Sequence, residues 1–241
     1  MTLHRYLAIN PLSEAHDRDH VEQVAARALE RLPDGACCVA DRLVLITSGT
    51  AITASSAGAV LVALGRVFAE PGGADLSAFS PGAGHAICST DGAWLIDKYW
   101  GRYVAFISDP LKQSVHVIRD PSAGIPCYYL SRDNVCYVAS DIDLLMQCGL
   151  LRKEVDWTQV ARHLLANQLR VAGTCLVGLT ELLPGYRLSS RPGGVSLDQL
   201  WSPWTFAARD VQIREKAEAV ERLRNTTIAC VRSLASGFDH V

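Results

Sequence analysis

The 241-residue sequence has no apolar run of the roughly 18 to 20 residues that a membrane-spanning helix needs. Its first 20 residues show no basic region followed by an apolar stretch, so no secretory signal peptide is expected. The 23 lysines and arginines nearly balance the 25 aspartates and glutamates. The net charge of −2 gives no electrostatic basis for binding nucleic acid or an anionic membrane. We therefore expect a cytoplasmic protein.

The eight cysteines include no Cys-x-x-Cys pair and no metal-ligand spacing with histidine, so we predict no metal site. Cys127, Cys136 and Cys175 lie in apolar runs, and a disulfide scaffold is unusual in a chain of this length and hydrophobicity. Reduced, mostly buried thiols are therefore expected. The glycine pairs at Gly72 and Gly193 lack the Ser or Lys of a phosphate-binding loop, and we interpret both as turns.

Apolar residues make up 49% of the chain, which is typical of a globular protein with a sizeable core. The pattern predicts a helix over residues 20–32, strands over 6–9, 37–40, 43–47 and 59–68, and a surface loop over 70–84. Four further short strands are predicted at 100–107, 115–118, 126–130 and 135–139. Tight polar turns join these four, which indicates an antiparallel meander. Their strands are apolar on both faces, so covering layers are expected on both sides.

The pattern becomes helical beyond residue 151. Asp156 is a plausible N-cap for a helix over 157–167, with Val160, Leu164 and Leu165 facing inward. Two strands are predicted through 182–188 and 195–200, and a long amphipathic helix runs from Ile213 to Leu234. The last residues resemble the start of a buried strand, which predicts that the chain is the N-terminal piece of a longer enzyme.

The stretch GRYVAFISDPLKQSVHVIRDPSAGIPCYYL, residues 101–130, resembles the glutamine amidotransferase domain of asparagine synthetase. That family has a strand of the type G-x-(F/Y)-A-(F/L)-x-(I/L)-x-D, followed by an apolar strand and the motif R-D-x-x-G-x-x-P-L-Y-Y. The segments YVASD at 137–141, LLPGYRL at 182–188 and LWSPW at 200–204 resemble further family motifs in the same order. Within the family, the WGRYVAF and LWSPW segments are most similar to lasso-peptide macrolactam cyclases.

The resemblance implies an α+β fold, the four-layer α/β/β/α sandwich of N-terminal-nucleophile hydrolases with antiparallel sheets. It implies a degenerate amidotransferase-like domain over 1–205, and a linker and first helix of a truncated synthetase domain over 206–241. The complete protein would be an ATP-dependent amide ligase. It would join a peptide N-terminus to an Asp or Glu side chain, with the precursor peptide and its leader-processing proteins as partners.

No segment matches the family's S-G-G-x-D-S loop, so ATP and Mg²⁺ are expected in the synthetase domain and no cofactor in this part. Two alternatives stay open. The protein is an asparagine synthetase-type, glutamine-hydrolysing amidotransferase, or it is a non-catalytic module that binds a peptide or partner.

The family's glutaminase nucleophile is a Cys directly after Met1, and here that position holds Thr2. Thr2 as a hydroxyl nucleophile is an alternative that the following Leu-His-Arg does not favour. The family's Asn-Gly, which polarises the amide carbonyl, corresponds to Leu64-Gly65. Arg42 and Asp91 are candidates for binding the glutamine carboxylate and amine. The alternative, at least equally supported by the sequence, is that both are simply turn residues. A side chain at position 64 that cannot donate a hydrogen bond predicts an inactive glutaminase.

Three residues of the family motif have an expected structural function. We predict that Arg119 and Asp120 belong to a turn in which Asp120 accepts bonds from its own downstream backbone and Gly124 supplies a positive φ. His116 alternates with apolar residues in a strand, so we interpret it as a satisfied structural histidine.

Overall fold

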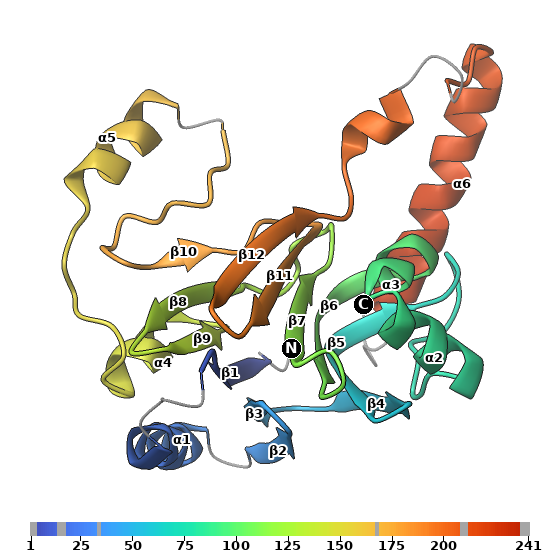
Figure 1. The fold of residues 1–241 in the computed structure, drawn as a ribbon. Coiled ribbons are helices and arrows are strands. Elements are labelled where there is room, and N and C mark those ends of the chain that lie inside the picture. The colour runs from blue at the N-terminus through green and yellow to red at the C-terminus, as the bar shows by residue number, and fades with distance from the viewer. Residues whose placement is uncertain (1–3, 14–17, 33–34, 167–168, 208–211, 237–241) are drawn as a thin grey trace.

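The computed structural model describes residues 4–13, 18–32, 35–166, 169–207 and 212–236. Two antiparallel six-stranded sheets lie face to face, with helices on the outer side of each (Figure 1). One buried cluster joins α1 (Arg18–Arg31) and α4 (Ile142–Gln147) to the first sheet, a second fills the space between the sheets, and a third joins α2 (Pro81–Ser89) and α3 (Ala93–Lys98) to the second sheet. The expected four-layer α/β/β/α sandwich is confirmed.

The strand order in space differs from the order along the chain in both sheets. The first sheet runs across its width from β10 (Thr180–Glu181) through β8 (Tyr128–Arg132), β9 (Val135–Ala139), β1 (Arg5–Pro11) and β3 (Leu43–Ser48) to β2 (Ala36–Ala40). The second sheet runs from β12 (Gly194–Gln199) through β11 (Tyr186–Arg191), β7 (Ser114–Arg119), β6 (Trp100–Asp109) and β5 (Ala59–Phe68) to β4 (Ala51–Ser56). Beyond the sandwich lie α5 (Trp157–Leu165), the short helix η1 (Pro203–Ala207) and α6 (Lys216–Ala235).

The predicted meander of four consecutive strands is wrong. β6 pairs with β7 in the second sheet, whereas β8 pairs with β9 in the first sheet. The chain therefore crosses between the sheets at residues 120–127. Strands that are apolar on both faces fit either sheet of a sandwich, so the hydrophobic pattern alone does not tell which sheet each strand joins.

The predicted loop over 70–84 extends too far, because α2 begins at Pro81. Ser80 caps this helix by accepting a hydrogen bond from the backbone N–H of Ala83 at 3.2 Å. The glycines suggested a loop, but Gly84 lies where the helix packs against β4, and a Cβ there would lie 3.0 Å from the Cβ of Ala54. Helix α3 and strand β4 were also missed.

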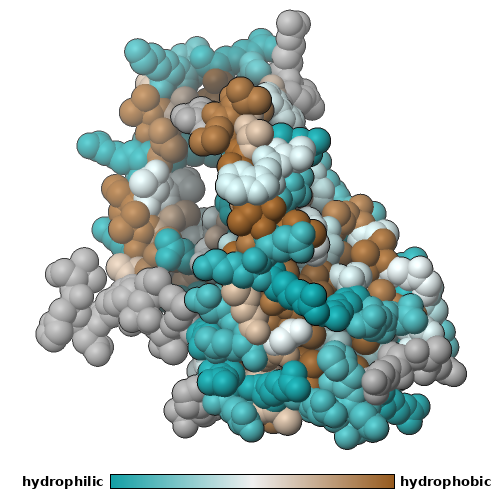
Figure 2. Space-filling model, turned by 90° about the vertical axis from the view of Figure 1, so that its left-hand side faces the viewer, coloured by the Kyte–Doolittle hydropathy of each residue, from teal (hydrophilic) through white to brown (hydrophobic). Residues whose placement is uncertain are grey.

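The helix predicted after Asp156 is confirmed, including its cap, since Asp156 accepts from the N–H of Gln159 at 3.0 Å. The prediction that Leu164 and Leu165 face inward is wrong, because they are 78% and 89% exposed. Figure 2 shows the side of the molecule on which α5 lies in Figure 1, and hydrophobic residues gather in the upper part of that side. Helix α6 likewise exposes most of its expected apolar face, and its only buried side chain among the described residues is Ser233.

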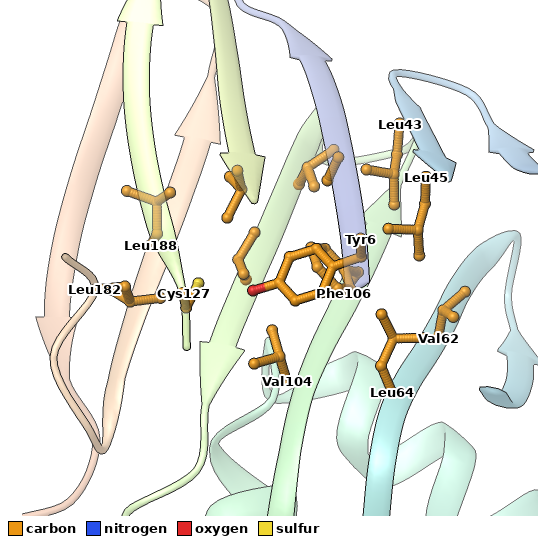
Figure 3. Close-up of a cluster of buried hydrophobic side chains, with 14 of the residues drawn as sticks. Tyr6, Leu43, Leu45, Val62, Leu64, Val104, Phe106, Cys127, Leu182 and Leu188 are labelled. Atoms are coloured by element: carbon orange, nitrogen blue, oxygen red, sulfur yellow. The ribbon is translucent and has the colours of Figure 1, made fainter. Parts of the chain in front are cut away.

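The space between the sheets is filled by aliphatic and aromatic side chains from both (Figure 3). Tyr6 of β1 and Phe106 of β6 meet edge to face, with ring centroids 5.4 Å apart. Leu64 of β5 belongs to this cluster and is fully buried. All eight cysteines are free thiols, but only four of them are buried, so the expectation of mostly buried thiols holds for half of them.

Replacing Leu64 by Ala should leave a cavity between the sheets. We expect Leu64→Ala to lower the free energy of unfolding by about 2 to 5 kcal/mol. Leu197 of β12 is 45% exposed, so Leu197→Ala should cost less than about 1 kcal/mol. Urea unfolding followed by circular dichroism measures both, and equal losses would contradict the burial of Leu64.

Candidate functional site

The residues expected around a glutamine site begin with Thr2, which lies outside the described residues. Leu64 is paired with Val104 of β6 and points into the hydrocarbon cluster between the sheets (Figure 3). It is 0% exposed, and its side chain has no group that can bind an oxyanion. The resemblance implies a hydrogen-bond donor at position 64. The structure instead has an apolar side chain packed in the core at this position.

Gly65 has a steric function in the same strand. Its φ is +103°, and a Cβ at this position would lie 2.2 Å from the carbonyl oxygen of Arg102 and 2.6 Å from Cδ1 of Ile125. Only glycine avoids both the unfavourable φ and the collision with backbone. The packing of β5 against β6 therefore requires glycine at position 65.

Arg42 lies in the two-residue turn between β2 and β3. Its Nη2 and Nε atoms donate to the carbonyl oxygen of Pro11 at 2.9 and 3.3 Å. These bonds fasten the end of β1 to the neighbouring hairpin. Arg42 is thus bound at Pro11, the C-terminal end of β1, whereas Thr2 precedes the N-terminal end of that strand.

Asp91 lies in the turn between α2 and α3, on the outer side of the second sheet. Its carboxylate pairs with Lys112 at 2.5 Å and lies 3.7 Å from Nε2 of His116. Its backbone carbonyl accepts a bond from Arg187 at 3.0 Å. Burial raises the pKa of Asp91, but the bond from Lys112 and the nearby positive groups outweigh burial and hold it below its usual range.

The structure does not bring these candidates together. Leu64 lies between the sheets, Asp91 on the outer side of the second sheet, and Arg42 on a hairpin of the first sheet. Each has protein partners that account for its position. The turn alternative offered for Arg42 and Asp91 describes their surroundings in this structure.

His116 of β7 belongs to a cluster of buried polar side chains that the sequence did not reveal. Nε2 of His116 lies 3.0 Å from Oγ of Ser114, and Nδ1 lies 2.9 Å from Oγ of Ser189 on the paired strand β11. All three side chains are at most 2% exposed. Burial lowers the pKa of His116 to about 4, which keeps the ring neutral near pH 7. His116 is the satisfied structural histidine that was predicted.

Arg119 at the end of β7 is 1% exposed and joins the two sheets. Its guanidinium donates to the carbonyl oxygens of Ile125 at 3.0 Å and Leu182 at 2.6 Å. It also pairs with the carboxylate of Glu181, in β10 of the first sheet, at 2.7 Å. Burial raises the pKa of Glu181, but Arg119 and Arg170 outweigh burial and lower it.

The turn after Arg119 has the predicted carboxylate bonds. Asp120 accepts from the N–H groups of Ser122 at 2.7 Å and Tyr103 at 3.3 Å. Burial raises the pKa of Asp120. The prediction for Gly124 is wrong, since the positive φ of +58° belongs to Ala123. Gly124 is needed for space, because a Cβ there would lie 2.3 Å from Cγ of Arg102.

Two kinds of feature are absent from the described ranges. No three His, Cys, Asp or Glu side chains within these ranges are grouped as a metal centre. No helix there combines the length and hydrophobicity that crossing a bilayer requires.

Residues 85–201, just under half of the chain, match a family described as "Glutamine amidotransferase domain". This part of the chain is similar to a glutamine amidotransferase domain. The match and the four layers agree with the N-terminal-nucleophile hydrolase fold expected from the sequence. No curated protein sequence matches the chain.

Three solved structures also resemble the chain. Glutamine phosphoribosylpyrophosphate amidotransferase from B. subtilis, complexed with ADP and GMP, has 12% identity and a TM-score of 0.47. A structure of the allosteric regulatory enzyme of purine biosynthesis has 12% identity and a TM-score of 0.49. Both comparisons cover 82% of this chain, which spans 49% of each of those chains. A glutamine aminotransferase class-II domain protein from Silicibacter pomeroyi has 13% identity and a TM-score of 0.42, covering 81% of this chain and 97% of that one.

His116 should make the stability of this amidotransferase-like domain depend on pH. Its pKa is about 4 in the folded chain and near 6.5 when unfolded, so the unfolded state takes up the proton first as pH falls. The free energy of unfolding should therefore drop between pH 6.5 and 4, by up to about 3 kcal/mol more in the wild type than in His116→Gln. Urea unfolding across this range measures the difference, and identical pH profiles would contradict it.

Proposed function

We propose that this chain is a glutaminase-inactive, class II amidotransferase-like domain of an asparagine synthetase-like amide ligase. The complete protein is a lasso-peptide cyclase. The side-chain carboxylate of an Asp or Glu of a precursor peptide takes AMP from ATP and releases pyrophosphate, and the peptide's N-terminal amine then displaces AMP to close a macrolactam. Such an enzyme has no need of ammonia, which would compete with the peptide amine for the activated acyl group.

The buried position of Leu64 carries this proposal. Amide hydrolysis needs donors aimed at the oxygen that becomes negative, and losing one such donor costs about 100- to 1,000-fold in kcat. At position 64 the chain has an aliphatic side chain packed between two sheets. A substrate carbonyl cannot reach that position unless the core opens.

The electrostatic surroundings of the other two candidates support the same conclusion. The carboxylate of Asp91 is neutralised by Lys112, and the guanidinium of Arg42 is bound to the carbonyl of Pro11. Binding the charged ends of free glutamine would require both partners to be displaced. The domain is therefore suited to a scaffolding function.

The second part of the proposal concerns residues 206–241, which we assign to the start of the synthetase domain that binds ATP and Mg²⁺. In α6, Val220, Leu223 and Val231 are 58 to 70% exposed. A helix with an uncovered apolar face is typical of an element that packs against a further domain. We propose the precursor peptide and its leader-processing proteins as partners, and the cytoplasm as the location.

The proposal is tested with the full-length protein, ATP, Mg²⁺ and the precursor peptide, with and without L-glutamine. We expect mass spectrometry to show a peptide lighter by one water, formed at the same rate in both cases. No glutamate should be released above the blank, and Thr2→Ala should form product at the wild-type rate.

Two results would contradict the proposal. Glutamate release that is lost in Thr2→Ala would identify Thr2 as a working nucleophile. Amide formation that requires glutamine would favour the asparagine synthetase-type alternative. Boiled protein and omission of ATP are the controls.

A further inference from the structure

The two sheets end in four edge strands, and three of these are protected against pairing with another chain. β10 has only two residues, one of which is the ion-paired Glu181. β12 carries Asp198, which pairs with Arg187. β4 has helix α2 packed along it, with Oγ of Ser56 2.9 Å from Nδ1 of His85. Short length, charge and a covering element are the means by which native sheets blunt their edges.

Among the residues that the structure describes, the edge strand β2 has none of these three protections. Its sequence, ACCVA, contains no charge and no proline, and its five residues are of typical strand length. The side chains of Cys37 and Val39 are exposed, Val39 by 69%. Helix α1 makes contacts with β1 and β3, the neighbouring strands of the same sheet. An uncharged apolar edge of this kind favours the addition of a further strand.

The backbone of β2 is self-complementary. A two-residue turn joins β2 to β3, so Ala40 and Leu43 form a hydrogen-bonded pair, as do Cys38 and Leu45. By alternation, Cys37 and Val39 direct their N–H and C=O groups away from β3. In an antiparallel pair of two such strands, Cys37 of each copy faces Val39 of the other. This register uses all four outward N–H groups and all four outward C=O groups.

We propose that β2 is the docking surface for a second copy of this chain, which pairs antiparallel with it about a two-fold axis at Cys38. A second copy of β2 fits this edge because the antiparallel register satisfies every outward backbone group and brings no like charges together. The exposed side chain of Val39 is partly covered in the pair. Four backbone hydrogen bonds make a small interface, so the dimer is weak and depends on concentration.

The register makes a specific prediction for Cys38. The two copies of Cys38 face each other as a non-hydrogen-bonded pair, with Cα atoms about 4.5 Å apart. This distance lies within the range of about 4.4 to 6.8 Å that a disulfide spans. An added aromatic disulfide reagent can trap the pair. One Cys38 thiolate attacks the reagent and releases one aryl thiolate, and the other Cys38 then displaces the protein-bound aryl thiolate, so two thiols are oxidised as the reagent is reduced.

The experiment uses the full chain with Cys37→Ala, which removes the exposed neighbouring thiol. Treatment with the reagent at high protein concentration should give a covalent dimer on a non-reducing gel, and peptide mapping should find the bond at Cys38. Adding Val39→Lys should lower the dimer yield about tenfold or more, because like charges then lie near each other across the axis. Val195→Lys on the edge strand β12 is the matched control, since Val195 is 38% exposed, and should leave the yield unchanged.

Sedimentation velocity without the reagent gives an independent reading. We expect the average mass to rise with concentration in the wild type and in Val195→Lys, but not in Val39→Lys. Circular dichroism verifies that each variant is folded. A monomer at every concentration, a bond between other cysteines, or equal yields from Val39→Lys and Val195→Lys would each overturn the proposal.

Discussion

The buried guanidinium of Arg119 is the interaction on which the arrangement of the two sheets depends. It belongs to β7 of the second sheet and binds Glu181 of the first sheet, with two backbone carbonyls as further acceptors. A charge 1% exposed is costly unless it is paired and hydrogen-bonded, and here three acceptors satisfy it. Removing it would leave the carboxylate of Glu181 without one of its two arginine partners, and the carbonyl of Leu182 without its partner at the crossover between the sheets.

Under the proposed function, this arrangement keeps a glutamine amidotransferase-like sandwich folded without glutaminase chemistry. Arg119, Asp120 and Gly124 hold the crossover at residues 120–127, and their bonds are made within the protein. Leu64 lies in the core between the two sheets, where its buried apolar side chain packs against other side chains and makes no hydrogen bond. Packing and the crossover stabilise the fold. Glutamine hydrolysis would need polar groups as well, and among the described residues Leu64 supplies none, while Arg42 and Asp91 are bound to protein partners.

The sequence predicts what depends on local pattern. The long apolar run at β5 and the cap at Asp156 are found where the residues indicated them. The pattern could not assign β6 and β8 to different sheets, because strands that are apolar on both faces fit either one. Helix α2 was missed because its glycines are typical of a loop. Leu164 was predicted to face inward because the apolar face of an amphipathic helix normally packs against another element.

The same limit applies to the candidate site. Asp120 and its turn were recognised because their bonds are local. Glu181 is 62 residues from Arg119, and Ser189 is 73 residues from His116, so these pairs exist only through the strand register. The positions of Arg42 and Asp91 were carried over from short motifs, and their distances in space depend on the whole topology.

We propose that the domain has the amidotransferase-like frame and no glutamine site. Titration calorimetry of the chain with L-glutamine tests it most directly, because binding is measured whether or not turnover follows. The account predicts no saturable heat. Saturable binding that is weakened by Asp91→Ala or Arg42→Ala would show that these residues form a glutamine site and would contradict the account.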